Sequence, residues 1–163
     1  MQYLLSSIYM AFGIGLLVGV IPQLLRAAGV VWVAVDPGAW QWTGAAMFVL
    51  GAAMYFSCGW DFAVRGKGTP AFWKPPRRLV INPWFRLVRN PMYVGVGLMI
   101  AAQGVWSGSL ALVAYAVAVV LGFHWFVVGY EEPNLRKVFG DSYDEYYRRV
   151  PRWIPRLARR TQS

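Results

Sequence analysis

Four long apolar segments dominate this sequence and limit the folds open to it. They run from about Leu4 to Leu25, Trp42 to Trp60, Met92 to Trp106 and Ser109 to Tyr130. A helix rises about 1.5 Å per residue and the hydrocarbon core of a bilayer is about 30 Å thick. The first, second and fourth segments are therefore long enough to cross a membrane, and the third is long enough with its flanks. The sequence predicts an all-α, polytopic membrane protein with four transmembrane helices.

The composition and length agree with this prediction. Hydrophobic residues make up 58% of the chain, whereas soluble domains have roughly 45–50%. With 163 residues the chain is expected to form one domain, 1–163, because a domain typically takes about 100–200 residues. Two N-terminal transmembrane helices fall in 1–64, and two more with a C-terminal tail fall in 65–163. The first apolar segment lacks a positive n-region, so we interpret it as a retained helix rather than a signal peptide.

The cations are concentrated in two blocks between and after the apolar segments. The net charge is +9, and only Arg26 lies outside the blocks. Because cytoplasmic loops are enriched in Lys and Arg, both blocks and both termini are predicted to be cytoplasmic and to face anionic lipid headgroups. Nucleic acid is disfavoured, since the cations do not line a solvated face. The blocks are Arg65, Lys67, Lys74, Arg77, Arg78, Arg86 and Arg89, then Arg136, Lys137, Arg148, Arg149, Arg152, Arg156, Arg159 and Arg160.

The tail after the fourth segment is predicted to form two short helices. Pro133 can open the first, through Phe139, and Gly140 can end it. Ser142 with a glutamate three residues later has the pattern of a capping box for the second, which Pro151 would close. The single cysteine makes an intramolecular disulfide impossible, and no metal site is expected.

The junction between the second loop and the third segment is the first place where chemistry is expected. Asn90 suits a helix N-cap and Pro91 the first helical position, so a helix should begin there with free N–H groups and a positive dipole end. Such an end can hold a carboxylate. Gly95 and Gly97 leave a groove that a flat ligand could approach, although close helix packing explains such glycines equally well.

Glu131 and Glu132 are the second such place. At the predicted end of the fourth helix, near the bilayer edge, two carboxylates oppose the helix dipole and lose hydration, so they need a partner. One explanation is pairing with Arg136 or Lys137. The other is a cationic ligand, whose amino or hydroxyl groups the carboxylates could bind.

His124 precedes Glu131 by two helical turns, which places both on one helix face. That face could line a ligand site. The alternative is a histidine that is hydrogen-bonded to a neighbouring helix, as polar side chains within membranes commonly are.

These residues resemble a known family, the membrane methyltransferases grouped around isoprenylcysteine carboxyl methyltransferase and the phospholipid N-methyltransferases. The resemblance lies in the order and spacing of several short motifs within 70–152. They are Pro70-Ala71-Phe72, Pro76-Arg77-Arg78-Leu79-Val80, Arg89-Asn90-Pro91-Met92-Tyr93-Val94-Gly95, and Glu131-Glu132 followed by Leu135, Phe139-Gly140, Tyr143, Tyr146 and Val150-Pro151-Arg152.

The resemblance implies a site for S-adenosyl-L-methionine at the cytoplasmic end of the last two transmembrane helices. Together with the predicted Gly95–Gly97 groove, the implied cofactor contacts are Arg77, Arg78, Leu79, Val80, Phe85, Asn90, Pro91, Met92, Tyr93 and Glu131. The family usually has histidine at the position of Asn90 and tyrosine at that of Phe85. Its carboxyl methyltransferases also have an arginine where this chain has Val127.

Methyl transfer from a sulfonium depends mainly on aligning the nucleophile and excluding water. A carboxylate acceptor needs no base, whereas an amine acceptor must lose a proton, and Glu132 or His124 could take it. The expected substrate is a lipophilic or lipidated molecule that reaches the site from the bilayer. Two alternatives stay open at this point: an NADPH-dependent membrane reductase of the steroid 5-alpha-reductase type, and a non-catalytic lipid-binding subunit.

Overall fold

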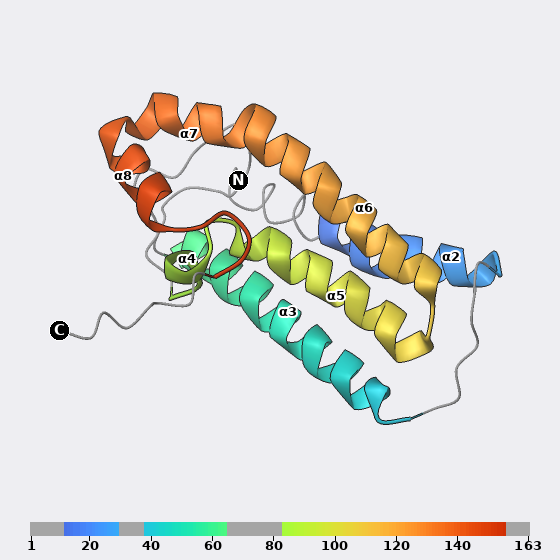
Figure 1. The fold of residues 1–163 in the computed structure, drawn as a ribbon. Coiled ribbons are helices and arrows are strands. Elements are labelled where there is room, and N and C mark those ends of the chain that lie inside the picture. Colours follow the sequence, from blue (N-terminus) through green and yellow to red (C-terminus); the bar gives the residue numbers. More distant parts are fainter. Residues whose placement is uncertain (1–11, 30–37, 65–82, 156–163) are drawn as a thin grey trace.

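The structure, a computed structural model, describes residues 12–29, 38–64 and 83–155 (Figure 1). All regular elements in these ranges are helical, as predicted. They are η1 (Gly15–Val20), α2 (Ile21–Ala27), α3 (Trp40–Val64), α4 (Pro83–Leu87), α5 (Pro91–Ser107), α6 (Leu110–Phe126), η2 (Val127–Glu131), α7 (Glu132–Phe139) and α8 (Asp141–Arg149).

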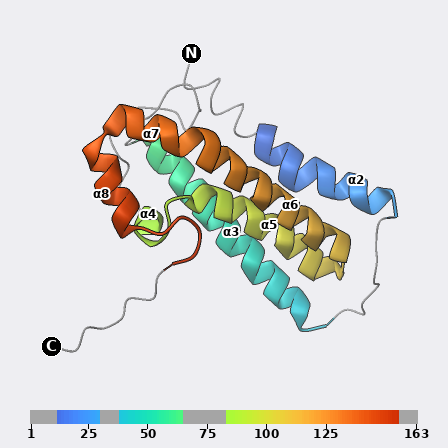
Figure 2. The ribbon, with the colours of Figure 1, turned by 45° about the horizontal axis from the view of Figure 1, so that its top comes forward.

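The arrangement of the helices brings distant parts of the sequence to one end of the molecule. α5 runs antiparallel to α3, and α6 returns beside α5 in both views (Figures 1 and 2). The end of α3, the start of α5 and the end of α6 therefore share one end, where α4, α7 and α8 also lie. Asn90, Tyr93, Glu131 and the other described candidate residues near them therefore lie at this end.

Two helical stretches are long and apolar enough to cross a membrane, Trp40–Asp61 and Leu110–Phe139. The first described helix, Phe12–Ala27, is apolar but shorter, and α5 has 17 residues. Much of the apolar surface is exposed, including Trp42 and Trp60, as expected where lipid rather than water covers it. The predicted number of four crossings stays a prediction.

Glycines allow α3 and α5 to approach closely. A Cβ atom placed on Gly51 would lie 2.6 Å from the carbonyl oxygen of Gly95, and one on Gly95 would lie 2.6 Å from that of Gly51. Gly44 meets the backbone of α5 in the same way near Trp106, at 3.0 Å. Without a hydrophobic driving force in lipid, such backbone contact is what holds helices together. α3 and α5 therefore form a closely packed pair, and the candidate residues from Asn90 to Tyr93 lie at the start of α5.

Gly51→Ala should therefore destabilise the protein by about 1–3 kcal/mol, the usual range for overpacking a close contact. Gly122→Ala is the matched control, because nothing lies within 4 Å of a Cβ there and alanine favours a helix. Thermal unfolding midpoints of both variants in one detergent check the prediction. Equal midpoints would mean that α3 and α5 do not pack at Gly51.

A proline in the first described helix explains two bonds that cross to other helices. Pro22 has no N–H group. It therefore cannot donate to the carbonyl of Val18, four residues earlier as in an α-helix, or to that of Leu17, five residues earlier as in the π-helical turn η1. Gln103 Nε2 donates to the Val18 carbonyl at 2.8 Å, and Tyr115 Oη donates to the Leu17 carbonyl at 3.2 Å. Neighbouring helices thus satisfy the carbonyls that the proline leaves, as membrane proteins require.

Only Trp106 to Ser109 separate the third and fourth apolar segments, a spacing that predicts a tight helical hairpin, and the structure has this hairpin. Gly108 ends α5 with a positive φ of 63°, and the Ser109 side chain accepts from the N–H of Leu112 at the start of α6. The predicted end of the fourth helix is wrong. The helix continues from α6 through the wide turn η2 into α7, with Pro133 in the first turn of α7.

This continuation removes the helix-dipole argument for Glu131 and Glu132, which lie inside a longer helix rather than at its end. α7 does end at Phe139, before Gly140 with its positive φ. The predicted capping box is also wrong, because α8 already begins at Asp141 and no side chain caps it. After α8 the chain turns back toward the start of α5 (Figure 1). We call residues 150–153 the strap.

Candidate functional site

The strap crosses the start of α5 and is held there by two hydrogen bonds. The N–H of Arg89 donates to the carbonyl of Pro151 at 2.8 Å. Asn90 Nδ2 donates to the carbonyl of Arg152 at 3.3 Å. Asn90 occupies the predicted N-cap position, but its side chain does not cap α5, which corrects that part of the prediction. The side chain instead joins the start of α5 to the strap.

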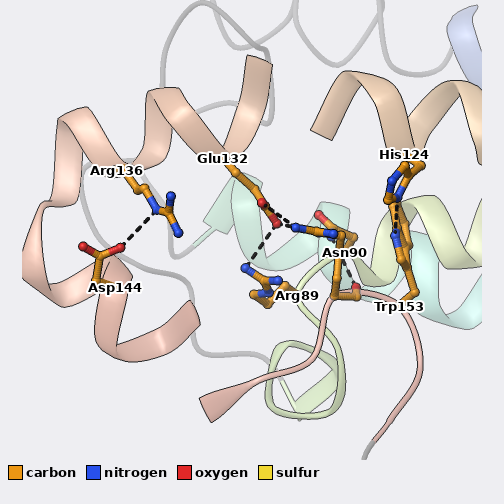
Figure 3. A network of polar contacts seen from close by, with 8 residues as sticks. Arg89, Asn90, His124, Glu132, Arg136, Asp144 and Trp153 are labelled. Atoms are coloured by element: carbon orange, nitrogen blue, oxygen red, sulfur yellow. Dashed lines mark hydrogen bonds and ion pairs between the residues drawn. The ribbon is translucent and has the colours of Figure 1, made fainter. Parts of the chain in front are cut away.

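Glu132 is the centre of a buried ion-pair cluster (Figure 3). Its carboxylate accepts hydrogen bonds from Arg152 Nε at 2.8 Å and from Arg152 Nη2 at 2.9 Å, so the contact is bidentate. Arg89 Nη1 lies 3.1 Å from the same carboxylate. The side chains of Glu132 and Arg89 are only 8% and 7% exposed. The hydrogen bonds with Glu132 also raise the pKa of Arg152, so its guanidinium stays charged.

The first of the two explanations for the glutamates, pairing with Arg136 or Lys137, is not what the structure shows. Arg136 binds Asp144 at 3.1 Å, near the surface. The Arg136 guanidinium also lies over the ring of Tyr147, as does that of Arg89 at 3.8 Å from the ring centre. Cation–π contact helps a desolvated guanidinium keep its place. Tyr147 of α8 therefore supports Arg89, one of the two arginines that bind Glu132, and Arg136 of α7 contacts the same ring.

Glu131 has a different environment from its neighbour. Its Oε2 accepts a hydrogen bond from Tyr93 Oη at 2.8 Å, which links the end of η2 to the first turn of α5. Among the described residues, no cation pairs with Glu131. The ring of Tyr93 packs against Phe123 of α6 at 4.6 Å between centroids. Of the two adjacent carboxylates, one thus binds two arginines, and the other accepts from a neutral hydroxyl as its partner among the described residues.

His124 is bonded to the strap rather than to a neighbouring transmembrane helix. Trp153 Nε1 donates to His124 Nδ1 at 3.1 Å (Figure 3). The Trp153 ring lies 6.1 Å from that of His124 and 6.5 Å from that of Tyr93. The strap tryptophan therefore bridges the helix that carries His124 and the helix that carries Tyr93.

Comparison of the sequence with known proteins assigns the chain to a family. The sequence model of the family described as phospholipid methyltransferase matches residues 39–142. The chain belongs to that family. The match runs from the start of α3 to the start of α8 and includes Tyr93, Glu131 and Glu132. No curated protein matches the chain.

Membership of the phospholipid methyltransferase family confirms the resemblance found in the sequence. The chain is a membrane methyltransferase with lipid-type substrates. The reductase of the steroid 5-alpha-reductase type, which the motifs alone left open, gains no support from this finding. The strap lies outside the matched residues, so its contacts are a feature that only the structure reveals.

Two of the candidate cofactor residues are packing positions in this methyltransferase. A Cβ atom on Gly97 would lie 2.7 Å from Val120 of α6, as one on Gly95 would meet α3. Both glycines are buried. Protein atoms thus occupy the space that the predicted groove left for a ligand, and the helix-packing alternative accounts for both residues.

The other candidate cofactor residues lie at the start of α5, in α4 and in a segment outside the described residues. Pro91 is buried at the start of α5, and Met92 packs against the core formed around Ile100. Phe85 lies in α4, and its carbonyl accepts from Tyr146 Oη at 2.8 Å. Their cofactor contacts stay predictions. Arg77, Arg78, Leu79 and Val80 lie outside the described residues.

Because Tyr143 of α8 is buried next to the Glu132 cluster, we expect the folded protein to lose stability at alkaline pH. Burial, aided by the negative charge of Glu132, raises the pKa of Tyr143 to about 12, whereas an unfolded tyrosine titrates near 10. Between these values the folded state keeps a proton that the unfolded state has lost, so stability present below pH 10 should fall as the pH rises toward 12. Unfolding midpoints of the methyltransferase measured across that range should fall less steeply in Tyr143→Phe. Parallel curves would contradict the assignment.

Sequence reasoning missed the residues that assemble the site from the tail. The sequence places Arg152 in a cation block and in a motif but predicts no partner for it, and it does not single out Trp153. The available signal was the buried acid itself: an adjacent pair of glutamates close to a bilayer needs cations, and a basic residue after Pro151 was one source. Nothing in the sequence pointed to the bond between Trp153 and His124.

Proposed function

We propose that this chain transfers a methyl group from S-adenosyl-L-methionine to a lipophilic substrate, and that Glu131 binds the cofactor. The observation that carries the proposal is the contrast between adjacent carboxylates. Glu132 is satisfied by Arg89 and Arg152, whereas the described partner of Glu131 is the neutral hydroxyl of Tyr93. A carboxylate near a bilayer without a cation favours a positively charged ligand.

The residues present fit the amino-acid end of that cofactor. The Glu131 carboxylate can accept from an ammonium group. No side chain caps α5, so its first N–H groups and its positive dipole end can hold a carboxylate. Tyr93 connects the two places through its bond to Glu131. When bound, the cofactor supplies an activated methyl group on a sulfonium, and these residues orient it.

Acid–base chemistry at the site is limited by contacts already made. A base role for Glu132 would require a free carboxylate oxygen, but both oxygens accept hydrogen bonds from Arg152, and Arg89 lies 3.1 Å away. The proposal therefore gives Glu132 the task of holding the strap. It favours an acceptor that reacts once it is aligned and water is excluded.

Calorimetry with S-adenosylhomocysteine on detergent-purified protein tests the cofactor. Radiolabelled methyl transfer to phosphatidylethanolamine and to a prenylated cysteine then tests the two acceptor classes. Binding with transfer to either acceptor supports the proposal. Absence of binding would contradict it and would favour a non-catalytic lipid-binding role.

We further propose that the chain crosses the membrane four times with both termini in the cytoplasm. The two spanning stretches and the cation blocks support this orientation. Cysteines introduced singly in Cys58→Ala protein, near Arg77 and near Arg156, should react with a membrane-impermeant label only after the membrane is opened. Labelling from outside intact cells would reverse the orientation.

A further inference from the structure

The hydrogen bond between Trp153 and His124 fixes which nitrogen of the imidazole carries a proton. An indole N–H group can only donate, so the nitrogen that faces Trp153 at 3.1 Å must present its lone pair. In the neutral ring the proton is then on the other nitrogen, Nε2. His124 thus has its lone pair engaged and a donor group directed elsewhere, which is the opposite of what a general base needs.

The Nε2–H group of His124 has no described protein acceptor. Among the residues that the structure describes, the polar contact of the ring is the bond from Trp153. His124 is half-buried in α6, a helix apolar enough to cross the membrane. A donor without an acceptor is costly in such a setting. A ligand that brings an oxygen atom would satisfy it.

The position of His124 indicates which ligand this is. Trp153 contacts both His124 and Tyr93, and Tyr93 holds Glu131, the proposed cofactor residue. Trp125, the next residue along α6, is 74% exposed on the apolar surface. His124 is half-buried, next in the chain to this exposed residue, and Trp153 lies against both its ring and that of Tyr93. A lipid that approached the site from the bilayer would pass this donor with its phosphate or ester oxygens.

We propose that Trp153 is a positioning residue that holds His124 with its Nε2–H outward, and that this group donates a hydrogen bond to a phosphate or ester oxygen of the lipid substrate. The lipid part rests on the proposed function. The tautomer part rests on the structure alone. Trp153 acts through His124, so its effect on the lipid must vanish when His124 is absent.

The chain contains one histidine, so nitrogen NMR of protein labelled with ¹⁵N-histidine reads His124 directly. At a fixed neutral pH the wild type should show one tautomer, with the proton on Nε2. Trp153→Phe keeps an aromatic ring but removes the indole N–H donor, so His124 should then show a mixture of tautomers. Trp125→Phe, the same substitution on a neighbour whose ring lies 6.2 Å from that of His124, should leave the tautomer as in the wild type. A proton on Nδ1, or on both nitrogens, in the wild type would overturn the proposal.

Adding lipid to the labelled protein tests the acceptor and separates its two sources. A shift of the Nε2 signal with dioleoyl phosphatidylethanolamine but not with dioleoylglycerol identifies the phosphate. A shift with both identifies the ester. A signal that neither lipid moves would overturn the lipid contact. These spectra need no turnover, so they decide this inference even if the protein fails to bind S-adenosylhomocysteine and the proposed function falls.

Methyl-transfer kinetics provide the second readout. His124→Phe should raise KM for the lipid by about 3- to 10-fold, the loss of one hydrogen bond. Trp153→Phe should raise KM by a smaller factor, because part of its tautomer mixture still presents Nε2–H. In both variants the affinity for S-adenosylhomocysteine should change less than KM does. His124→Gln, whose amide still donates, should recover part of the loss. In the double variant Trp153→Phe should add nothing to His124→Phe. Additive effects, or equal losses in KM and cofactor affinity, would reduce Trp153 to a structural residue and overturn the proposal.

Discussion

Glu132→Gln is expected to destabilise the folded protein by about 3–5 kcal/mol, the range for removing one partner of a buried ion pair. The amide keeps the size of the side chain but removes the charge, which leaves the buried Arg89 without its carboxylate and weakens the bond from Arg152. Because those arginines connect α5 and the strap to α7, the loss should appear in the unfolding midpoint and as earlier proteolysis after Val150.

Glu145→Gln is the matched control for this experiment. Glu145 also pairs with an arginine, Arg149, but both side chains are more than half exposed. Exposed pairs contribute little, so the midpoint should change by no more than about 0.5 kcal/mol in equivalent free energy. Equal effects of the two substitutions would mean that the Glu132 cluster is solvated and holds nothing in place.

Glu131→Gln should give the reverse pattern, a loss of ligand affinity with little loss of stability. Glutamine can still accept from Tyr93 Oη, so the described protein contact survives. The negative charge proposed to bind the cofactor does not survive. We expect S-adenosylhomocysteine to bind more weakly by about 1–3 kcal/mol, or roughly 5- to 150-fold in Kd.

Calorimetry and thermal unfolding of the same Glu131→Gln preparation check both halves of this prediction. Glu132→Gln serves as the comparison, since it changes the same chemical group one residue along the chain. An unchanged affinity together with a lowered midpoint would make Glu131 a structural residue and would remove the main support for the proposed cofactor site.

Local chemistry was sufficient to predict much of the fold. The hairpin at Gly108 followed from a short run of small and polar residues between two apolar segments, and the start of α5 followed from Asn90 and Pro91. The failure at Glu131 had a local cause as well. Two carboxylates and Pro133 suggested a helix end, but a wide turn tolerates a proline, and periodicity alone does not foresee such a turn.

The site could be predicted only in part because its bonds join distant segments. The motifs identified Asn90, Tyr93 and Glu131, but the bond from Asn90 to Arg152 spans 62 residues and that from Trp153 to His124 spans 29. Such pairs depend on how helices are placed in space, which composition and spacing do not specify. Gly95 and Gly97 show the same limit, since a packing glycine and a ligand groove look alike in one sequence.

The order of synthesis gives the strap a further significance. Every described bond of Pro151, Arg152 and Trp153 reaches back to a residue that the ribosome has already made, in the segment before α5, in α6 or in α7. The helices can therefore enter the bilayer before the strap exists, and docking of the strap is a late step of biogenesis. A nascent chain interrupted before Pro151 would retain its membrane segments but leave Glu132 with Arg89 as its only arginine of the cluster.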